Sequence, residues 1–342
     1  MEVIILDTQH NNIKLTAAEI SQIWGAYQNA TISKCFFQYF SAIVEDQDIK
    51  ALVQHGLELS ESHIEQLTAF FNNESYPVPQ GFTDNDVNVG APRLYSDSYI
   101  LYYLYQLGKL GINAFSVAVA LSARSDIHTY FSQCLSEYTK FHKMVTDLLL
   151  NKGLYIRPPY LPTPDKVEFV NKQSFLTGWF GNRRPLVSLE VTNLYDNIQR
   201  NALGVSTLIG FSQVASSKKV RQYMVRGKEI AAKHVEIFGS ILREDDLPVP
   251  MSWDMEVTDS TVSPFSDKLM MFLTTGLIAI GMGYYGTSMA TTLRRDIQTH
   301  YGRLTSEIGK YAEDGANIMI DNGWMEHPPK SADRDKLARN KD

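Results

Sequence analysis

Apolar residues recur at helical spacing over four long stretches of the chain, and the same pattern then appears a second time. In the first half these stretches cover about 16–45, 47–73, 96–124 and 126–152. Apolar positions three and four residues apart form one stripe along a helix. The stripe of the first stretch consists of Leu15, Ile23, Ala26, Ala30, Phe37, Phe40 and Val44. Strand signals are sparse, so the pattern predicts four long helices in each half.

The second half of the chain repeats the first. A shift of 171 positions, which becomes 170 after one deletion, aligns identical residues over some 145 positions. The aligned pairs include His63 with His234, Pro77-Val78-Pro79 with Pro248-Val249-Pro250, Asp126-Ile127 with Asp296-Ile297, Glu137 with Glu307, and Pro158-Pro159 with Pro328-Pro329. Self-similarity at a fixed spacing is the sequence signature of a duplicated structural unit.

The lengths of the connections predict how the helices of each repeat are arranged. Helices one and two follow each other almost directly, as do helices three and four, so each pair should form an antiparallel hairpin. About 23 residues rich in Pro, Gly, Asn and Asp separate helices two and three. A 27-residue helix is roughly 40 Å long, and an extended connection of this length can span it. A single long crossover of this kind is typical of a ferritin-like bundle.

We therefore predict an all-α protein made of two tandem ferritin-like four-helix bundles, with a long crossover between helices two and three of each. The expected divisions are a first bundle at 1–160, a linker at 161–184, a second bundle at 185–330 and a charged, disordered tail at 331–342. Phe169, Phe175, Trp179 and Phe180 make the linker too apolar to be free in solvent. We expect it to pack against one bundle or between the two.

Composition limits the classes of function. The formal net charge of −6 argues against a nucleic-acid-binding protein, whose phosphate contacts need a basic face. The two cysteines, Cys35 and Cys134, do not form a disulfide framework, and we expect both to be buried in a reducing cytoplasm. The uncharged stretch 269–290 is long enough to cross a bilayer. Its four glycines favour a helix packed closely inside a bundle, so no membrane span is expected.

A ferritin-like bundle raises the question of a two-metal centre bridged by carboxylates. Such a centre needs one Glu from each of two helices and a Glu-x-x-His pair from each of the other two. Helix two contains no Glu-x-x-His in either repeat, and helix three carries no carboxylate near its middle. The sequence also lacks phosphate-binding glycine loops, a nucleophile elbow and HExxH. We therefore expect a complete di-iron site to be absent, and we favour a protein that is not an enzyme.

Several ionisable residues nevertheless lie on the predicted apolar stripes, where they need partners. One interpretation is a structural Glu–His hydrogen bond between helices one and two of each repeat. The alternative is a partial site for a small ligand or for a metal ion, Fe, Mn or Zn. Of the two interpretations we favour the one in which the protein binds no cofactor. The candidate ligands are Glu19, His63, Glu137 and His142 in the first repeat, and Glu190, His234 and Glu307 in the second.

Long phrases of the sequence resemble a known family. They include RLYSDSYILYYLYQLGKLG, SDIHTYFSQCLSEYTK, LLLNKGLYIRPPYLP, KVEFVNKQSFLTGWFG and LREDDLPVPMSWDMEVTDSTVSPFSDKLMMF. These phrases are similar to the tandem ferritin-like proteins of endospore-forming bacteria, a family of unknown function that resembles the coat-F type of spore coat protein. The resemblance implies a bundle fold, a spore-forming Gram-positive source and a spore-associated structural role. It implies no reaction.

Three hypotheses about function follow. The leading one is a non-catalytic structural or interaction protein with protein partners or self-association, cytoplasmic or spore-associated. The second is a metal-binding or oxidative ferritin-like protein. The third is a bundle that binds a small molecule or lipid, which the uncharged stretch 269–290 suggests.

Overall fold

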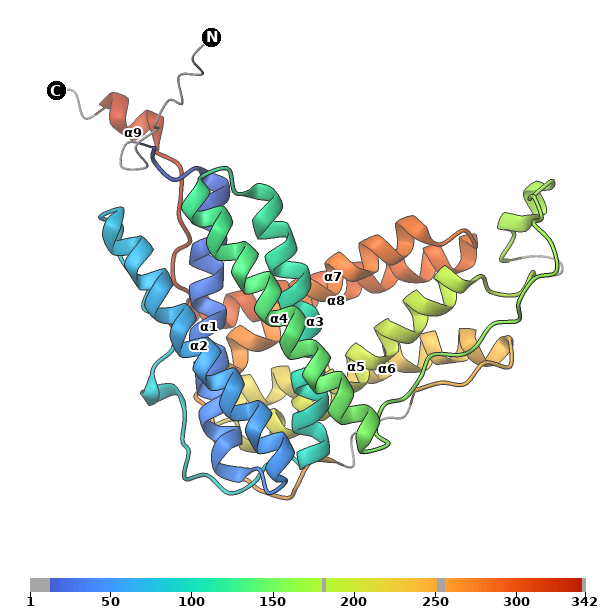
Figure 1. Cartoon of the computed structure of the whole chain (residues 1–342), viewed down its shortest axis with the longest axis horizontal. Coiled ribbons are helices and arrows are strands. Elements are labelled where there is room, and N and C mark those ends of the chain that lie inside the picture. The colour runs from blue at the N-terminus through green and yellow to red at the C-terminus, as the bar shows by residue number, and fades with distance from the viewer. Residues whose placement is uncertain (1–12, 180–182, 251–255, 340–342) are drawn as a thin grey trace, which may run out of the picture.

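The computed structural model describes residues 13–179, 183–250 and 256–339, and over these ranges it contains helices but no strand (Figure 1). A short helix, α9 (Arg334–Arg339), lies in the charged tail with all its residues exposed. The eight long helices are α1 (Ala17–Ile43), α2 (Gln47–Asn73), α3 (Asp97–Leu121), α4 (Ser125–Asn151), α5 (Ser188–Val214), α6 (Lys218–Glu244), α7 (Asp267–Thr291) and α8 (Arg295–Asp321). The predicted all-α fold class is confirmed.

Local sequence signals set the helix boundaries, which agree with the predicted ranges to within about three residues. Thr16 and Glu19 form a capping box at the start of α1, and the Asp46 side chain caps α2. Gly153 and Gly323 follow α4 and α8 with φ of 68° and 64°, a backbone conformation that glycine adopts without strain.

The crossover between α2 and α3 runs the length of the bundle, as predicted. Asp97, in the first turn of α3, accepts hydrogen bonds from the N–H groups of Glu45 and Asp46 in the α1–α2 turn. The start of α3 therefore lies at the same end as the start of α2, so the two helices run parallel. Asp267 makes the equivalent bonds to Ser216 and Ser217 in the second repeat.

A second carboxylate holds the opposite end of each repeat. Glu19, at 1% exposure, accepts hydrogen bonds from the N–H groups of Ala123 and Arg124 in the α3–α4 turn, at 3.1 and 2.7 Å. Glu190 does the same for Leu293 and Arg294, at 3.1 and 3.0 Å. Each hairpin therefore supplies a carboxylate that binds the turn of the other hairpin. We call these four residues (Glu19, Asp97, Glu190 and Asp267) the turn-binding carboxylates.

The two repeats meet through their crossovers, which pair antiparallel at two isolated bridges. Val87 bridges Phe265 and Tyr95 bridges Val257, two contacts that the 170-residue shift interchanges. The contact therefore has approximate two-fold symmetry. One apolar core continues through it, with Phe36 packed on Phe265 at a centroid distance of 4.2 Å. In Figure 1 the helices of the second repeat run across those of the first.

The expected packing of the linker is only partly correct. Phe169 and Trp179 are 81% and 51% exposed, whereas Phe175 is half-buried, with the Arg184 guanidinium 4.1 Å from its ring centroid. Phe180 lies outside the described residues. The linker therefore contacts the second bundle through Phe175 and Arg184, which binds Glu190. It leaves the apolar side chain of Phe169 in solvent.

The expectation that α7 packs closely at its glycines is wrong. A side chain added at Gly276, Gly281, Gly283 or Gly286 would meet nothing within 4 Å. In the most apolar stretches of α3 and α7, only 33% and 28% of the residues are buried. Both helices are long and apolar enough to cross a membrane by length and composition alone, which is weak evidence for a span. The glycines of α7 leave room beside the helix.

The turn-binding carboxylates generate a prediction about stability. The hydrogen bonds from Thr16, Arg124 and Ala123 outweigh the opposing effect of burial and lower the pKa of Glu19. Glu19→Gln should therefore reduce the free energy of unfolding at pH 7 by about 2 kcal/mol, the usual loss for hydrogen bonds to a charged group. Because the pKa of Glu19 is lower in the folded protein, the stability difference between wild type and variant should have its full size above about pH 4.5. The difference should shrink as the pH falls through the folded-state pKa.

Urea denaturation between pH 3 and pH 7 measures this effect. The exposed Glu65→Gln is the control, because it removes a carboxylate without touching a turn. Equal losses in both variants would show that Glu19 does not hold the α3–α4 turn.

Candidate functional site

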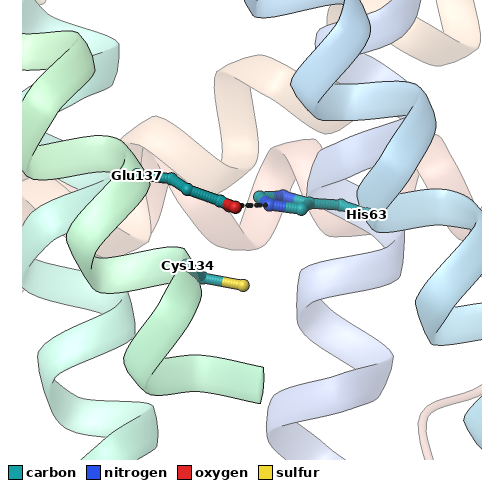
Figure 2. A group of neighbouring side chains, drawn as sticks. All are labelled: His63, Cys134 and Glu137. Carbon is teal, nitrogen blue, oxygen red and sulfur yellow. Dashed lines mark hydrogen bonds and ion pairs between the residues drawn. The ribbon is translucent and has the colours of Figure 1, made fainter. Parts of the chain in front are cut away.

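The first repeat places His63 of α2 against Glu137 of α4. His63 is 4% exposed, and its Nε2 lies 2.9 Å from Oε2 of Glu137 (Figure 2). Gln133, one turn earlier on α4, donates a hydrogen bond to the other carboxylate oxygen at 2.8 Å. The hydrogen bond with His63 lowers the pKa of Glu137 below its usual value. The pair therefore joins two helices that belong to different hairpins.

Cys134 lies beside this pair and was not among the sequence candidates. It precedes Glu137 by three residues on α4, so both side chains lie on the same face of the helix. Its Sγ, a ring nitrogen of His63 and a carboxylate oxygen of Glu137 all lie within 4.8 Å of one another (Figure 2). Burial raises the pKa of the Cys134 thiol to about 12. The spacing of Cys134 and Glu137 could have suggested the group, but their approach to His63 depends on tertiary packing.

The second repeat contains the same pair in a different environment. Nε2 of His234 lies 3.2 Å from Glu307, and Nδ1 lies 2.9 Å from the hydroxyl of Tyr285. Lys233 also binds the carboxylate of Glu307. Leu304 occupies the position equivalent to Cys134. Both ring nitrogens of His234 therefore have partners within the protein.

The remaining candidates lie elsewhere. Glu19 and Glu190 are turn-binding carboxylates, so the expected Glu–His pair between helices one and two is corrected to a pair between helices two and four. The ring of His142 packs on Tyr105 at 5.0 Å and against Gly108. His142 is not part of the group formed by His63, Cys134 and Glu137.

A cavity of about 400 Å³ lies between the two repeats, and His63 forms part of its wall. Most of its lining comes from α1, α3, α5 and α7. Apolar and small residues dominate, among them Gly25, Ala114, Leu110, Gly276, Leu277, Ile280 and Gly281. The apolar surfaces of α3 and α7 that the core leaves uncovered therefore contribute to one shared space, which is partly open to solvent because Leu277 and Ile280 remain exposed.

A cluster of polar and charged groups lies in and beside this cavity on α3 and α5. Gln106 is 6% exposed, and neither its amide nitrogen nor its amide oxygen has a hydrogen-bond partner. Arg200 stacks on Tyr284 and binds Asp196 at 2.5 Å. Asp196 also binds Lys109, whose pKa burial lowers despite this carboxylate. Two cations thus share one carboxylate, which leaves an excess of positive charge.

The fold and the site together define a duplicated helical-bundle protein with a cavity between its repeats. The chain belongs to the family described as "Protein of unknown function (DUF3231)", whose model matches residues 4–167 and again residues 174–337. This confirms the expected membership of a tandem family of unknown function.

No curated protein matches the chain. The chain is similar to a crystal structure from Bacillus halodurans described as "a putative spore coat protein", with 20% identity and a TM-score of 0.40, over 45% of this chain and 99% of that one. At this level of similarity the description says nothing about the function of this chain.

The buried pair of the second repeat should make stability depend on pH. Burial lowers the pKa of His234, an effect that the hydrogen bond with Glu307 only partly offsets. The unfolded chain therefore gains a proton at His234 before the folded protein does. Stability should fall as the pH decreases below about 6.5, by at most about 1.4 kcal/mol per pH unit.

Urea denaturation between pH 7.5 and pH 5 tests this expectation with His234→Asn. The difference in stability between wild type and variant should narrow as the pH falls. The exposed His128→Asn controls for loss of a histidine. A constant difference for His234→Asn would show that this residue does not contribute the dependence.

Proposed function

We propose that this protein is a non-catalytic binding protein that holds a long-chain fatty acid, or an amphiphile of the same kind, in the cavity between its repeats. The observation that carries this proposal is a largely apolar cavity of about 400 Å³ whose walls come from both copies. That volume lies within the range of about 300–1,000 Å³ that is common for small-molecule sites.

The apolar part of the cavity suits an acyl chain. Leu110 and Ala114 on α3 face the same space as Leu277, Ile280 and Gly281 on α7. Leu277 and Ile280 remain 37% and 41% exposed, so part of their apolar surface is available for a further contact. Covering such surface with a hydrocarbon chain would contribute about 25 cal/mol for each Å² removed from water.

The polar groups of α3 and α5 suit a carboxylate head group. The Arg200 guanidinium can bind a carboxylate through two N–H groups, and the unpaired amide of Gln106 can add a further hydrogen bond. The equivalent positions on α1 and α7 are Asn29 and Gly276. The cavity therefore offers a guanidinium on one side of the approximate two-fold axis and an uncharged amide at the equivalent position on the other.

The fold supports a ferritin-like classification of each repeat. Two antiparallel hairpins joined by one long crossover have the connectivity that ferritin-like bundles share. The predicted protein partners or self-association, the cytoplasmic or spore-associated location and the absence of a membrane span remain predictions from the sequence.

The cavity can be tested by filling it. Gly281→Leu should lower the affinity for a fluorescent fatty acid at least tenfold, because Gly281 lines the cavity and open space surrounds its Cα. Replacing a helical glycine should also raise the stability of α7 by about 1 kcal/mol. Fluorescence titration and thermal melting measure the two effects.

Gly286→Leu is the matched control. Gly286 lies on the same helix with the same open space but does not line the cavity. Gly286→Leu should gain stability and keep the wild-type affinity. If the wild type shows no saturable binding, or if both variants bind like the wild type, the proposal is wrong, and the leading structural hypothesis gains.

The head-group site makes a separate prediction. Arg200→Gln should weaken binding of the fluorescent fatty acid about tenfold and leave binding of its methyl ester unchanged, because the ester carries no charge to pair with Arg200. Competition titration with both probes measures the difference. An equal loss for acid and ester would contradict recognition of the carboxylate by Arg200.

A further inference from the structure

We propose that His63, Cys134 and Glu137 bind one zinc ion in the first repeat, and that the second repeat has lost or never gained this site. The three residues project from α2 and α4 toward one point (Figure 2). The proposal does not depend on the fatty-acid site, although His63 also forms part of the cavity wall.

The ligand types and their spacing suit zinc. Imidazole nitrogen, thiolate sulfur and carboxylate oxygen are the three donors that zinc uses in proteins. Donors about 2.0–2.3 Å from a tetrahedral zinc ion lie roughly 3.5 Å apart. The donor atoms here lie within 4.8 Å of one another, and the Glu137 oxygen and the His63 nitrogen are already 2.9 Å apart. Small rotations of the side chains would complete the geometry and leave a fourth position open.

A thiolate ligand favours zinc over the iron or manganese of a carboxylate-bridged centre. Soft sulfur donors select zinc, whereas iron and manganese sites of bundles depend on several carboxylates. Glu137 is the carboxylate of this group. Binding would release the proton of the Cys134 thiol to solvent, so it would strengthen with rising pH.

The second repeat shows what the same His–Glu pair looks like as a structural contact. There, Tyr285 occupies the second ring nitrogen of His234, and Lys233 neutralises Glu307. In the first repeat Phe115 and Ser62 replace Tyr285 and Lys233, while Cys134 replaces Leu304. These differences remove a competing hydroxyl and a repelling cation, and they add a soft ligand.

One more replacement acts in the same direction. Arg303 of the second repeat, whose charge lowers the pKa of His234, corresponds to Gln133 in the first. Gln133 donates a hydrogen bond to Oε1 of Glu137, the carboxylate oxygen that does not bind His63. Such a bond holds a metal-binding carboxylate in one orientation. Four changes around one pair that both repeats share therefore all favour a cation in the first repeat.

Cobalt(II) is the probe for this site, because a cobalt–thiolate bond gives a charge-transfer absorption that oxygen and nitrogen ligands do not. Titration of the full-length metal-free protein should give this absorption with a stoichiometry of one cobalt per chain, and zinc should abolish it. Cys134→Ser should lose the absorption, and His63→Asn should weaken binding at least tenfold.

Two matched controls come from the chain itself. Cys35→Ser removes the other buried thiol, whose pKa burial also raises to about 12, and should keep the absorption. His234→Asn breaks the structural pair of the second repeat and should also keep it. Gly281→Leu should bind cobalt like the wild type, so failure of the fatty-acid proposal would not affect this one.

A surface substitution guards against variants that fail to fold. Ser62→Lys introduces the lysine of the second repeat at an exposed position and should weaken cobalt binding at least tenfold while circular dichroism stays unchanged. The proposal is overturned if the wild type shows no thiolate–cobalt absorption at stoichiometric metal. It is also overturned if the absorption survives Cys134→Ser or disappears equally in Cys35→Ser.

Discussion

The hydrogen bonds of the turn-binding carboxylates are the constraint on which the rest of the structure depends. Two helical hairpins could slide along each other, because apolar stripes on long helices repeat and offer several similar registers. Asp97 binds the α1–α2 turn and Glu19 binds the α3–α4 turn, so both ends of the first repeat are fixed. Their equivalents, Asp267 and Glu190, fix the second. Register errors would leave these carboxylates without partners at a cost that few alternative packings could offset.

Because the ends of each bundle are fixed, the side chains in the middle can differ between the two repeats. The His–Glu pair between helices two and four is present in both repeats, at 2.9 and 3.2 Å, while its neighbours differ almost completely. The same holds where the repeats meet. Tyr95 donates a buried hydrogen bond to the Thr207 carbonyl, whereas at the equivalent contact Phe265 packs on Phe36. A polar contact and an apolar contact can therefore occupy equivalent positions in the two repeats, because neither contact determines the register of the helices.

Much of the fold could be predicted from the sequence, because helix length, repeat register and connection length are local or additive features. The apolar stripe of the first helix predicts a histidine partner for Glu19, whereas the Thr-x-x-Glu spacing of Thr16 and Glu19 indicates the capping box that the structure contains. An acidic residue on an apolar stripe can bind a backbone turn as well as a metal, and its position along the helix distinguishes the two. The approach of Cys134 to His63 could not be predicted, since it depends on the packing of helices from different hairpins. The surroundings of the α7 glycines could not be predicted either, because glycines on an apolar helix are compatible both with close packing and with open space beside the helix.

Duplication within one chain permits an asymmetry that a dimer of identical subunits could not have. In such a dimer, any polar group on one side of the two-fold axis would recur on the other. Here Gln106, Lys109, Asp196 and Arg200 correspond to Gly276, Ala279, Gly25 and Asn29. Gln106 and Arg200 therefore line the cavity on α3 and α5, whereas the equivalent lining residues on α7 and α1, Gly276 and Asn29, carry no charge. An amphiphile would be bound in one orientation, with its head group at the contact between α3 and α5, and the fusion of the repeats would be what makes that orientation unique.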